Sequence, residues 1–136
     1  MKTAADLGEV EFISSGTFID RVTGGFPRAR ITELWCDEST GKTTLVLQFI
    51  AEAQRQGLKC LFVDAEHSFE PSYARTLGVE LKKLALIEEE VAEDALNELL
   101  SVMGNYDVVV IDSIGALRTR AQAEKQLGEK TIGSQA

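Results

Sequence analysis

A loop with the composition of a phosphate-binding site spans residues 36–44 and reads Cys-Asp-Glu-Ser-Thr-Gly-Lys-Thr-Thr. It lies between an apolar segment over 31–35, which predicts a strand, and residues 42–56, whose spacing of apolar side chains predicts a helix. Backbone N–H groups of such a loop can surround phosphates, and the helix N-terminus adds partial positive charge. Gly41 permits the close backbone approach that a side chain would block.

Two side chains of this loop suit a nucleotide with Mg²⁺. Lys42 would supply a positive charge to the outer phosphates, and Thr43 a hydroxyl ligand to the metal. The pattern departs from the phosphate-loop consensus at Cys36, where the consensus has glycine. Taken alone, Gly-Lys-Thr is weak evidence for a phosphate site, and an ordinary helix N-terminus capped by Ser39 or Thr40 explains it better.

Acidic residues at two later strand ends strengthen the nucleotide interpretation. Asp112 ends the β-branched run 108–111, and a carboxylate there can hold the Mg²⁺ shell through water. In isolation, Asp112 would be interpreted as a solvent-exposed acid at the end of a strand. Glu66 follows the apolar run 60–63 and is the candidate base that polarises an attacking water. For His67, a structural role is favoured over a catalytic one.

The elements that must position these residues alternate between strand and helix. Such alternation predicts an α/β fold with a parallel sheet, helices on its faces, and ligands beyond the C-terminal strand ends. The run 60–63 lacks polar alternation, so it is expected to be covered on both faces, and 108–111 is the best candidate for a central strand. The expected elements are strands at 31–35, 60–63, 84–87 and 108–111, and helices at 42–56, from Pro71, and at about 91–103.

Composition narrows the class of protein further. The 136 residues are 44% apolar and 26% charged, which fits one soluble domain, and no run approaches the ~18 apolar residues of a membrane helix. A cytoplasmic protein with no membrane partner is therefore expected. The net charge of −8 argues against a general nucleic-acid surface, so any DNA contact must be local and made by a few cations. Two cysteines and one histidine support neither a disulfide framework nor a metal cluster.

Several consecutive segments resemble bacterial RecA recombinases, a family of P-loop NTPases, and the resemblance extends over residues 13–136. It implies a RecA-like core, a mostly parallel twisted sheet flanked by helices, truncated on its C-terminal side. The segment 1–12 before this core is polar and is expected to be loosely held. The segments are 13–20, 24–31, the loop 37–44, Phe62-Val63-Asp64-Ala65-Glu66-His67, 71–79, and Val110-Ile111-Asp112-Ser113 with Ala116-Leu117.

The resemblance implies a role for individual residues. Lys42 and Thr43 would bind phosphate and Mg²⁺, Glu66 would activate water, and Asp112 would support the metal. Tyr73 would stack on adenine, although packing of its helix explains a tyrosine equally well. The expected ATP contacts are Asp37, Glu38, Ser39, Thr40, Gly41, Lys42, Thr43, Thr44, Glu70 and Tyr73.

The family also implies a function: a DNA-dependent ATPase that promotes strand exchange as a filament on single-stranded DNA, with copies of itself or related recombinase subunits as partners. The first DNA-binding loop would fall at about 125–132, where Lys125, Gly128 and Lys130 are the candidate contacts, although a flexible surface loop describes the segment equally well. The family's second DNA-binding loop has no counterpart in these residues.

Two alternatives remain open at this point. Cys36 and the absent C-terminal elements favour a catalytically weakened domain that acts as an interaction or filament-modulating module. A hexameric helicase core shares the fold, but the segments 62–67 and 71–79 favour the recombinase branch.

Overall fold

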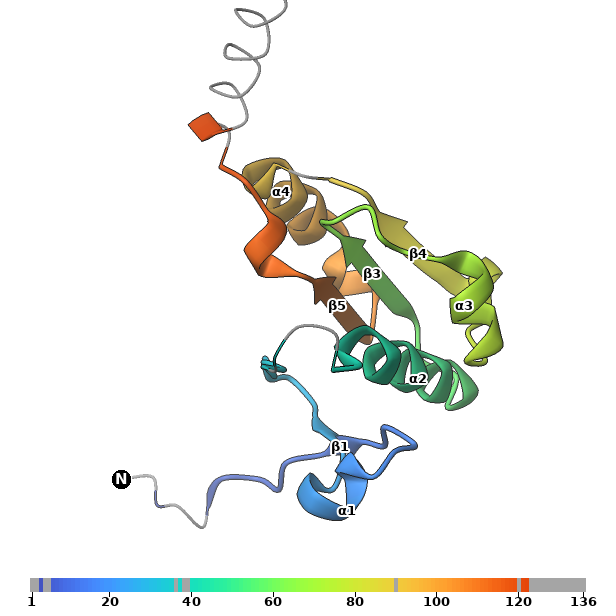
Figure 1. Cartoon of the computed structure of the whole chain (residues 1–136). Coiled ribbons are helices and arrows are strands. Elements are labelled where there is room, and N and C mark those ends of the chain that lie inside the picture. Colours follow the sequence, from blue (N-terminus) through green and yellow to red (C-terminus); the bar gives the residue numbers. More distant parts are fainter. Residues whose placement is uncertain are drawn as a thin grey trace, which may run out of the picture.

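A parallel sheet of three strands forms the centre of the molecule (Figure 1). The computed structural model describes residues 3, 6–35, 37, 40–89, 91–119 and 121–122. Strand β3 (Cys60–Asp64) lies between β4 (Leu84–Ile87) and β5 (Val108–Asp112), and both neighbours run parallel to it. Because Asp64 pairs in register with Asp112, the carboxyl ends of β3 and β5 lie at the same edge of the sheet.

Helices cover both faces of this sheet, as the alternation of elements predicted (Figure 1). Helix α2 (Lys42–Arg55) packs on one face and α4 (Ala92–Val102) on the other, whereas α3 (Pro71–Thr76) follows β3. Three short 3₁₀ helices complete this region, η2 (Leu81–Lys83), η3 (Met103–Asn105) and η4 (Ile114–Ala116). No helix in the described ranges is long and apolar enough to cross a bilayer.

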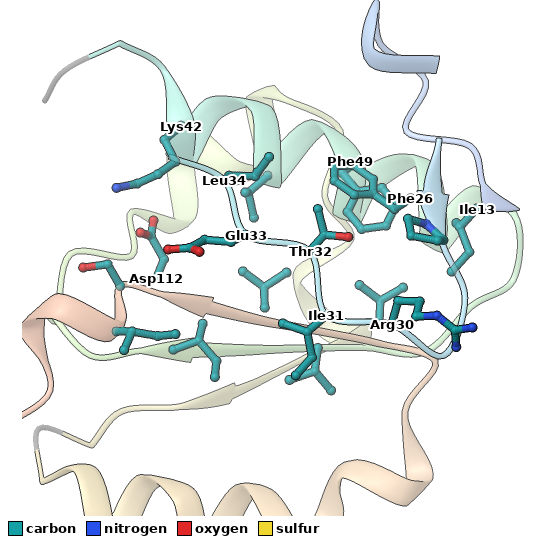
Figure 2. Close-up of a pocket in the computed structure, with 18 of the residues that line it drawn as sticks. Ile13, Phe26, Arg30, Ile31, Thr32, Glu33, Leu34, Lys42, Phe49 and Asp112 are labelled. Carbon is teal, nitrogen blue, oxygen red and sulfur yellow. The ribbon is translucent and has the colours of Figure 1, made fainter. Parts of the chain in front are cut away.

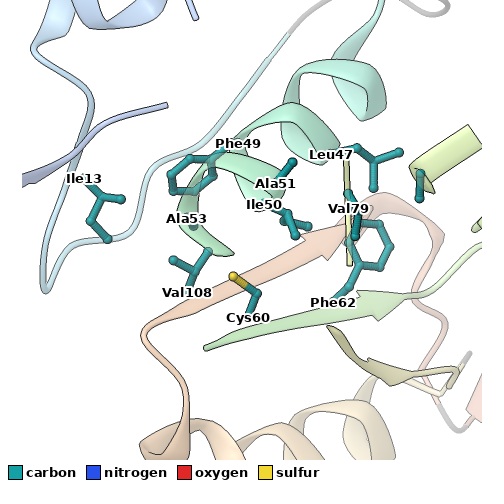
Figure 3. Packing of buried hydrophobic residues seen from close by; sticks show 11 residues of the cluster. Ile13, Leu47, Phe49, Ile50, Ala51, Ala53, Cys60, Phe62, Val79 and Val108 are labelled. Carbon is teal, nitrogen blue, oxygen red and sulfur yellow. The ribbon is translucent and has the colours of Figure 1, made fainter. Parts of the chain in front are cut away.

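The side chains of β3 divide between two hydrophobic clusters. Cys60 and Phe62 pack with α2, as Figure 3 shows, and Leu61 and Val63 pack with α4. All five residues of β3 are buried, which confirms the expected strand covered on both faces. Strand β3 therefore lies between the two helical layers and packs against both.

The central strand of the described sheet is β3 and not β5, so the prediction for the run 108–111 was wrong in this respect. Within the described residues β5 pairs with β3 alone, and most of its residues are only partly buried. A β-branched apolar run indicates that both faces are covered, but it carries no information on how many neighbouring strands pair with it.

The predicted strand at 31–35 is also absent, since these residues adopt no regular secondary structure. Ile31 is fully exposed (100%) and Trp35 is 88% exposed. A strand requires a neighbour that satisfies its backbone groups, and this segment pairs with none of the described strands. A cavity separates it from β5.

A small N-terminal unit precedes the sheet and docks on α2 (Figure 1). It consists of the antiparallel strands β1 (Phe12–Ile13) and β2 (Phe26–Pro27) around α1 (Ile19–Thr23). The rings of Phe26 and Phe49 lie 4.4 Å apart between centroids and join this unit to α2. The division of the chain near residue 13 stays a prediction.

Asp20 organises the loop between β1 and α1. Its carboxylate accepts hydrogen bonds from the Ser15 hydroxyl at 2.5 Å, the Ser14 hydroxyl at 2.7 Å and the Ser15 N–H at 2.8 Å. These bonds, with the Ser15 hydroxyl contributing most, lower the pKa of Asp20 to about 2. The ionised carboxylate therefore joins the loop at Ser14 and Ser15 to the start of α1.

Candidate nucleotide-binding site

The N-terminus of α2 begins as a phosphate-binding loop requires. Gly41 precedes the helix with a φ of 92°, in the left-handed region that residues with a Cβ rarely adopt. No side chain of the described residues caps this end, because the Thr40 hydroxyl donates instead to the carbonyl of Asp37 at 2.7 Å. This geometry disfavours Thr40 as a conventional cap and leaves the first N–H groups of α2 available to an anion.

The strongest evidence for a site is the contact between Thr43 and Asp112, which lie 69 residues apart. The Thr43 hydroxyl, in the first turn of α2, donates to a carboxylate oxygen of Asp112 at 2.6 Å, at the end of β5. The fold thus places together the two oxygen ligands that the sequence predicted for Mg²⁺. Both residues are partly buried, so water can still reach them.

Glu66 lies beside the same strand end. The Ser113 hydroxyl, next to Asp112, donates to a carboxylate oxygen of Glu66 at 2.8 Å. The loop that carries Glu66 is fixed by Asp64, whose buried side chain (1% exposed) accepts from the N–H groups of Ser68 at 3.1 Å and Phe69 at 2.7 Å. The orientation of Glu66 therefore depends on a buried carboxylate two residues earlier.

The residues expected at the adenine lie at the start of α3. The Tyr73 hydroxyl is 2.7 Å from the Thr44 hydroxyl, and Tyr73 remains 42% exposed, so its ring lies beside the first turn of α2. Glu70 caps α3 and accepts from the hydroxyl of Ser72 at 2.7 Å and from its N–H at 3.1 Å. These bonds, the hydroxyl first, lower the pKa of Glu70. Its carboxylate is thus engaged in the helix, whereas the Tyr73 ring is accessible.

A cavity of about 650 Å³ opens beside this site, between β5, α2 and the segment 30–35. Figure 2 shows Lys42, Glu33 and Asp112 gathered at one end, and Arg30 and Phe26 at the other.

The donor set fits Mg²⁺ better than a metal held by protein alone. No cluster of three or more His, Cys, Asp or Glu side chains occurs among the described residues. Mg²⁺ with a nucleotide commonly uses one or two carboxylates or hydroxyls, the phosphates and water. Thr43 and Asp112 provide that number of ligands.

Several predicted site residues lie outside the described residues: Cys36, Glu38, Ser39, Lys125, Gly128 and Lys130.

Sequence reasoning assigned no role to two residues of this site, Asp64 and Ser113, although both lie within the motifs that resemble RecA. Asp64 carried a usable signal, because it ends a buried strand in the same way as Asp112 does. Ser113 carried none beyond its position next to Asp112.

His67 adopts a positive φ of 51°, and its Nδ1 lies 4.0 Å from the carboxylate of Glu88.

A scan against family models matches residues 2–136 to the RecA N-terminal domain. The chain belongs to this family. The resemblance found in the sequence motifs is thereby confirmed, and the α/β architecture with a parallel sheet is the one expected for a RecA-like core.

Curated relatives of this RecA N-terminal domain carry the name Protein RecA. Those from Rhizobium leguminosarum bv. viciae and Agrobacterium fabrum are each 47% identical over 133 residues, covering 94% of this chain and 38% and 37% of their own lengths. The relative from Chlorobaculum parvum is 49% identical over 115 residues, covering 83% of this chain and 33% of its own. The chain thus spans less than two-fifths of the length of these relatives.

Proposed function

We propose that this RecA N-terminal domain binds ATP with Mg²⁺ at the N-terminus of α2. The observation that carries the proposal is the 2.6 Å contact between Thr43 and Asp112, because it joins the phosphate-loop helix to the acidic strand end. The uncapped helix start behind Gly41 supports the same assignment.

In this proposal each side chain has a distinct task. The N–H groups of α2 and the Lys42 ammonium bind the phosphates, and the hydroxyl of Thr43 and carboxylate of Asp112 hold the metal or its water. When bound, Mg²⁺ would offset the negative charge of the phosphate oxygens. The Tyr73 ring offers an accessible face for adenine, which its exposure supports.

Hydrolysis is assigned to Glu66. Its carboxylate would accept a proton from the attacking water, and the hydroxyl of Ser113 holds one of its oxygens at 2.8 Å. The second oxygen remains for the water.

At the level of the whole protein, we propose an ATPase core of a DNA strand-exchange protein that acts as a filament on single-stranded DNA in the cytoplasm. Family membership and the names of the relatives support this proposal. Since the net charge is −8, DNA contacts are assigned to a few local cations, Lys125 and Lys130, in an assembly of subunits. ATP would then serve as the switch between assembly and release.

Calorimetric titration of Mg²⁺-ATP into the chain tests the binding site. Saturable binding should be lost in Lys42→Ala and kept in Lys59→Ala, which removes a lysine at the opposite end of β3. Equal binding by both variants would refute the assignment. Cys36→Gly should tighten binding by about 1–2 kcal/mol if a residue with a Cβ strains the loop.

Steady-state phosphate release tests Glu66 separately. Glu66→Gln should bind ATP as the unaltered chain does but lose hydrolysis, by about 10²-fold or more. Glu98→Gln, the same change on an exposed position of α4, should alter neither property. Unchanged hydrolysis in Glu66→Gln would eliminate it as the base.

The alternative is an interaction module of the same fold that does not turn over ATP. Cys36 at a consensus glycine favours it. Absence of ATP binding in both the unaltered chain and Cys36→Gly, with the fold intact by circular dichroism, would select this alternative.

A further inference from the structure

Thr44 connects the phosphate loop to the helix that carries Tyr73. It follows Thr43 in the first turn of α2, and its hydroxyl is 2.7 Å from the hydroxyl of Tyr73, 29 residues further along the chain. The two hydroxyls share one hydrogen bond, in which either can be the donor. Adjacent threonines thus reach two parts of the site: Thr43 contacts Asp112 at the acidic strand end, and Thr44 contacts α3.

The backbone of this turn, rather than the Thr44 hydroxyl, is available to phosphate. The first N–H that bonds within α2 is that of Leu45, which donates to the carbonyl of Gly41 at 2.9 Å. The N–H groups of residues 42–44 precede it, so the helix itself offers them no carbonyl. The hydroxyl of Thr44 is engaged with Tyr73. A substitution that removes only this hydroxyl therefore leaves the phosphate-binding backbone in place.

Other contacts fix the position of α3 on α2. Ala74, next to Tyr73, is fully buried (0% exposed) in the hydrophobic cluster that also contains α2 residues. Beyond α3, the backbone of Glu80 forms two hydrogen bonds with the side chain of Gln54, whose amide nitrogen donates at 3.1 Å and whose oxygen accepts at 2.9 Å. These contacts hold the backbone, whereas the Tyr73 side chain is 42% exposed. The bond to Thr44 therefore orients the ring more than it places the helix.

We propose that Thr44 is a positioning residue for the nucleobase, which acts by holding the Tyr73 ring ready to stack on adenine. The inference rests on the proposed ATP site and adds to it a link between the phosphate end and the base end of the nucleotide. Immobilising a free side chain on binding lowers affinity by about two- to tenfold, and a ring that is already oriented avoids this cost. The Thr44 hydroxyl thus strengthens binding only of ligands that carry a stacking base.

Calorimetric titrations with Mg²⁺-ATP and with Mg²⁺-tripolyphosphate, which has no nucleoside, separate the two ends of the ligand. The measured quantity is the preference for ATP, the ratio of the two dissociation constants. Thr44→Val keeps the β-branched shape without the hydroxyl, and Tyr73→Phe keeps the ring. Each should reduce the preference for ATP by about two- to tenfold, and Thr44→Ser, which retains a hydroxyl, should restore it.

A double-mutant cycle identifies the hydrogen bond as the cause. Both substitutions remove the same bond, so the double variant should lose no more of the preference than either single variant. Two matched controls remove a hydroxyl elsewhere. Thr76→Val acts on α3, where the hydroxyl donates to the carbonyl of Ser72 at 3.0 Å, and Tyr106→Phe lies before β5, at the opposite end of the sheet. Both controls should keep the preference of the unaltered chain.

Three results would overturn the inference while the phosphate site stands. The first is a Thr44→Val variant that keeps the preference for ATP. The second is equal weakening of ATP and tripolyphosphate, which would assign the hydroxyl to the phosphates. The third is additive losses in the double variant. Circular dichroism checks the fold of each variant, and should Thr44→Val unfold, an unchanged preference in Tyr73→Phe has the same force.

Failure of the proposed ATP site has a different signature. In that case the unaltered chain binds neither ligand, or Lys42→Ala binds both as the unaltered chain does. Either result would overturn the ATP site and the role of Thr44 together.

Discussion

Replacing Asp64 by asparagine should destabilise the chain through the loop that carries Glu66. The Asp64 carboxylate is buried and accepts from two N–H groups, of Ser68 at 3.1 Å and Phe69 at 2.7 Å. Asparagine has the same shape but only one acceptor oxygen, so its NH₂ group must face one of the two donors. Leaving one such donor unsatisfied costs about 1–3 kcal/mol.

Urea unfolding followed by circular dichroism measures this cost, which should lower the midpoint by about 1 M. Hydrogen exchange at Ser68 and Phe69 gives a local measurement, and at least one of the two amides should exchange about tenfold faster or more.

The matched control is the same substitution at Asp112. That carboxylate is partly exposed and accepts from a hydroxyl, which can rotate to accept a hydrogen bond from asparagine instead. Asp112→Asn should therefore cost less than about 1 kcal/mol. If Asp64→Asn unfolds within 0.5 kcal/mol of the unaltered chain, on the scale of ordinary surface substitutions, the two N–H bonds do not stabilise the loop and the reasoning fails.

Three further predictions follow from the backbone and the titratable groups. Gly41→Ala should destabilise by about 1–2 kcal/mol in urea because φ is 92° there, whereas Gly104→Ala, where φ is not positive, should be within 0.5 kcal/mol of neutral. The pKa of Asp20 falls from 3.8 to about 2 on folding, so its contribution to the stability of the N-terminal unit is complete above pH ~4 and is lost as the pH falls toward 2. Nuclear magnetic resonance should show the N-terminal unit loosening as the pH approaches ~2, and Asp20→Asn should abolish this pH dependence. Burial, with a smaller effect of the Asp107 charge, raises the pKa of Cys60 to about 11, so in a Cys36→Ser variant a thiol reagent at pH 8 should react only after unfolding.

The sequence predicted the elements whose signal is local. Helix α2 and strand β3 are buried by apolar side chains that recur along their own residues, and this recurrence is visible in the sequence. The strand predicted at 31–35 depends on a neighbour that must pair with it, and no pattern within five residues records such a neighbour. The same limitation explains why β5 was expected to be central.

The candidate site was predictable to a similar extent. Thr43 and Asp112 could be paired in advance because a strand end and a helix start follow general rules of parallel sheets. The hydrogen bond from the Ser113 hydroxyl to Glu66 depends on the path of a loop, and so do the two N–H bonds to Asp64. Amino-acid composition does not determine the path of a loop.

Among the described strands β5 pairs on one side alone, and this has a consequence for how the protein behaves at high concentration. A parallel apolar strand with free backbone groups is a template on which other chains can stack into fibrils. Mutual repulsion at a net charge of −8 opposes such contacts between molecules. Since this repulsion reaches only about 8 Å at 0.15 M salt but about 30 Å at 0.01 M, the chain should stay dispersed longest in dilute buffer.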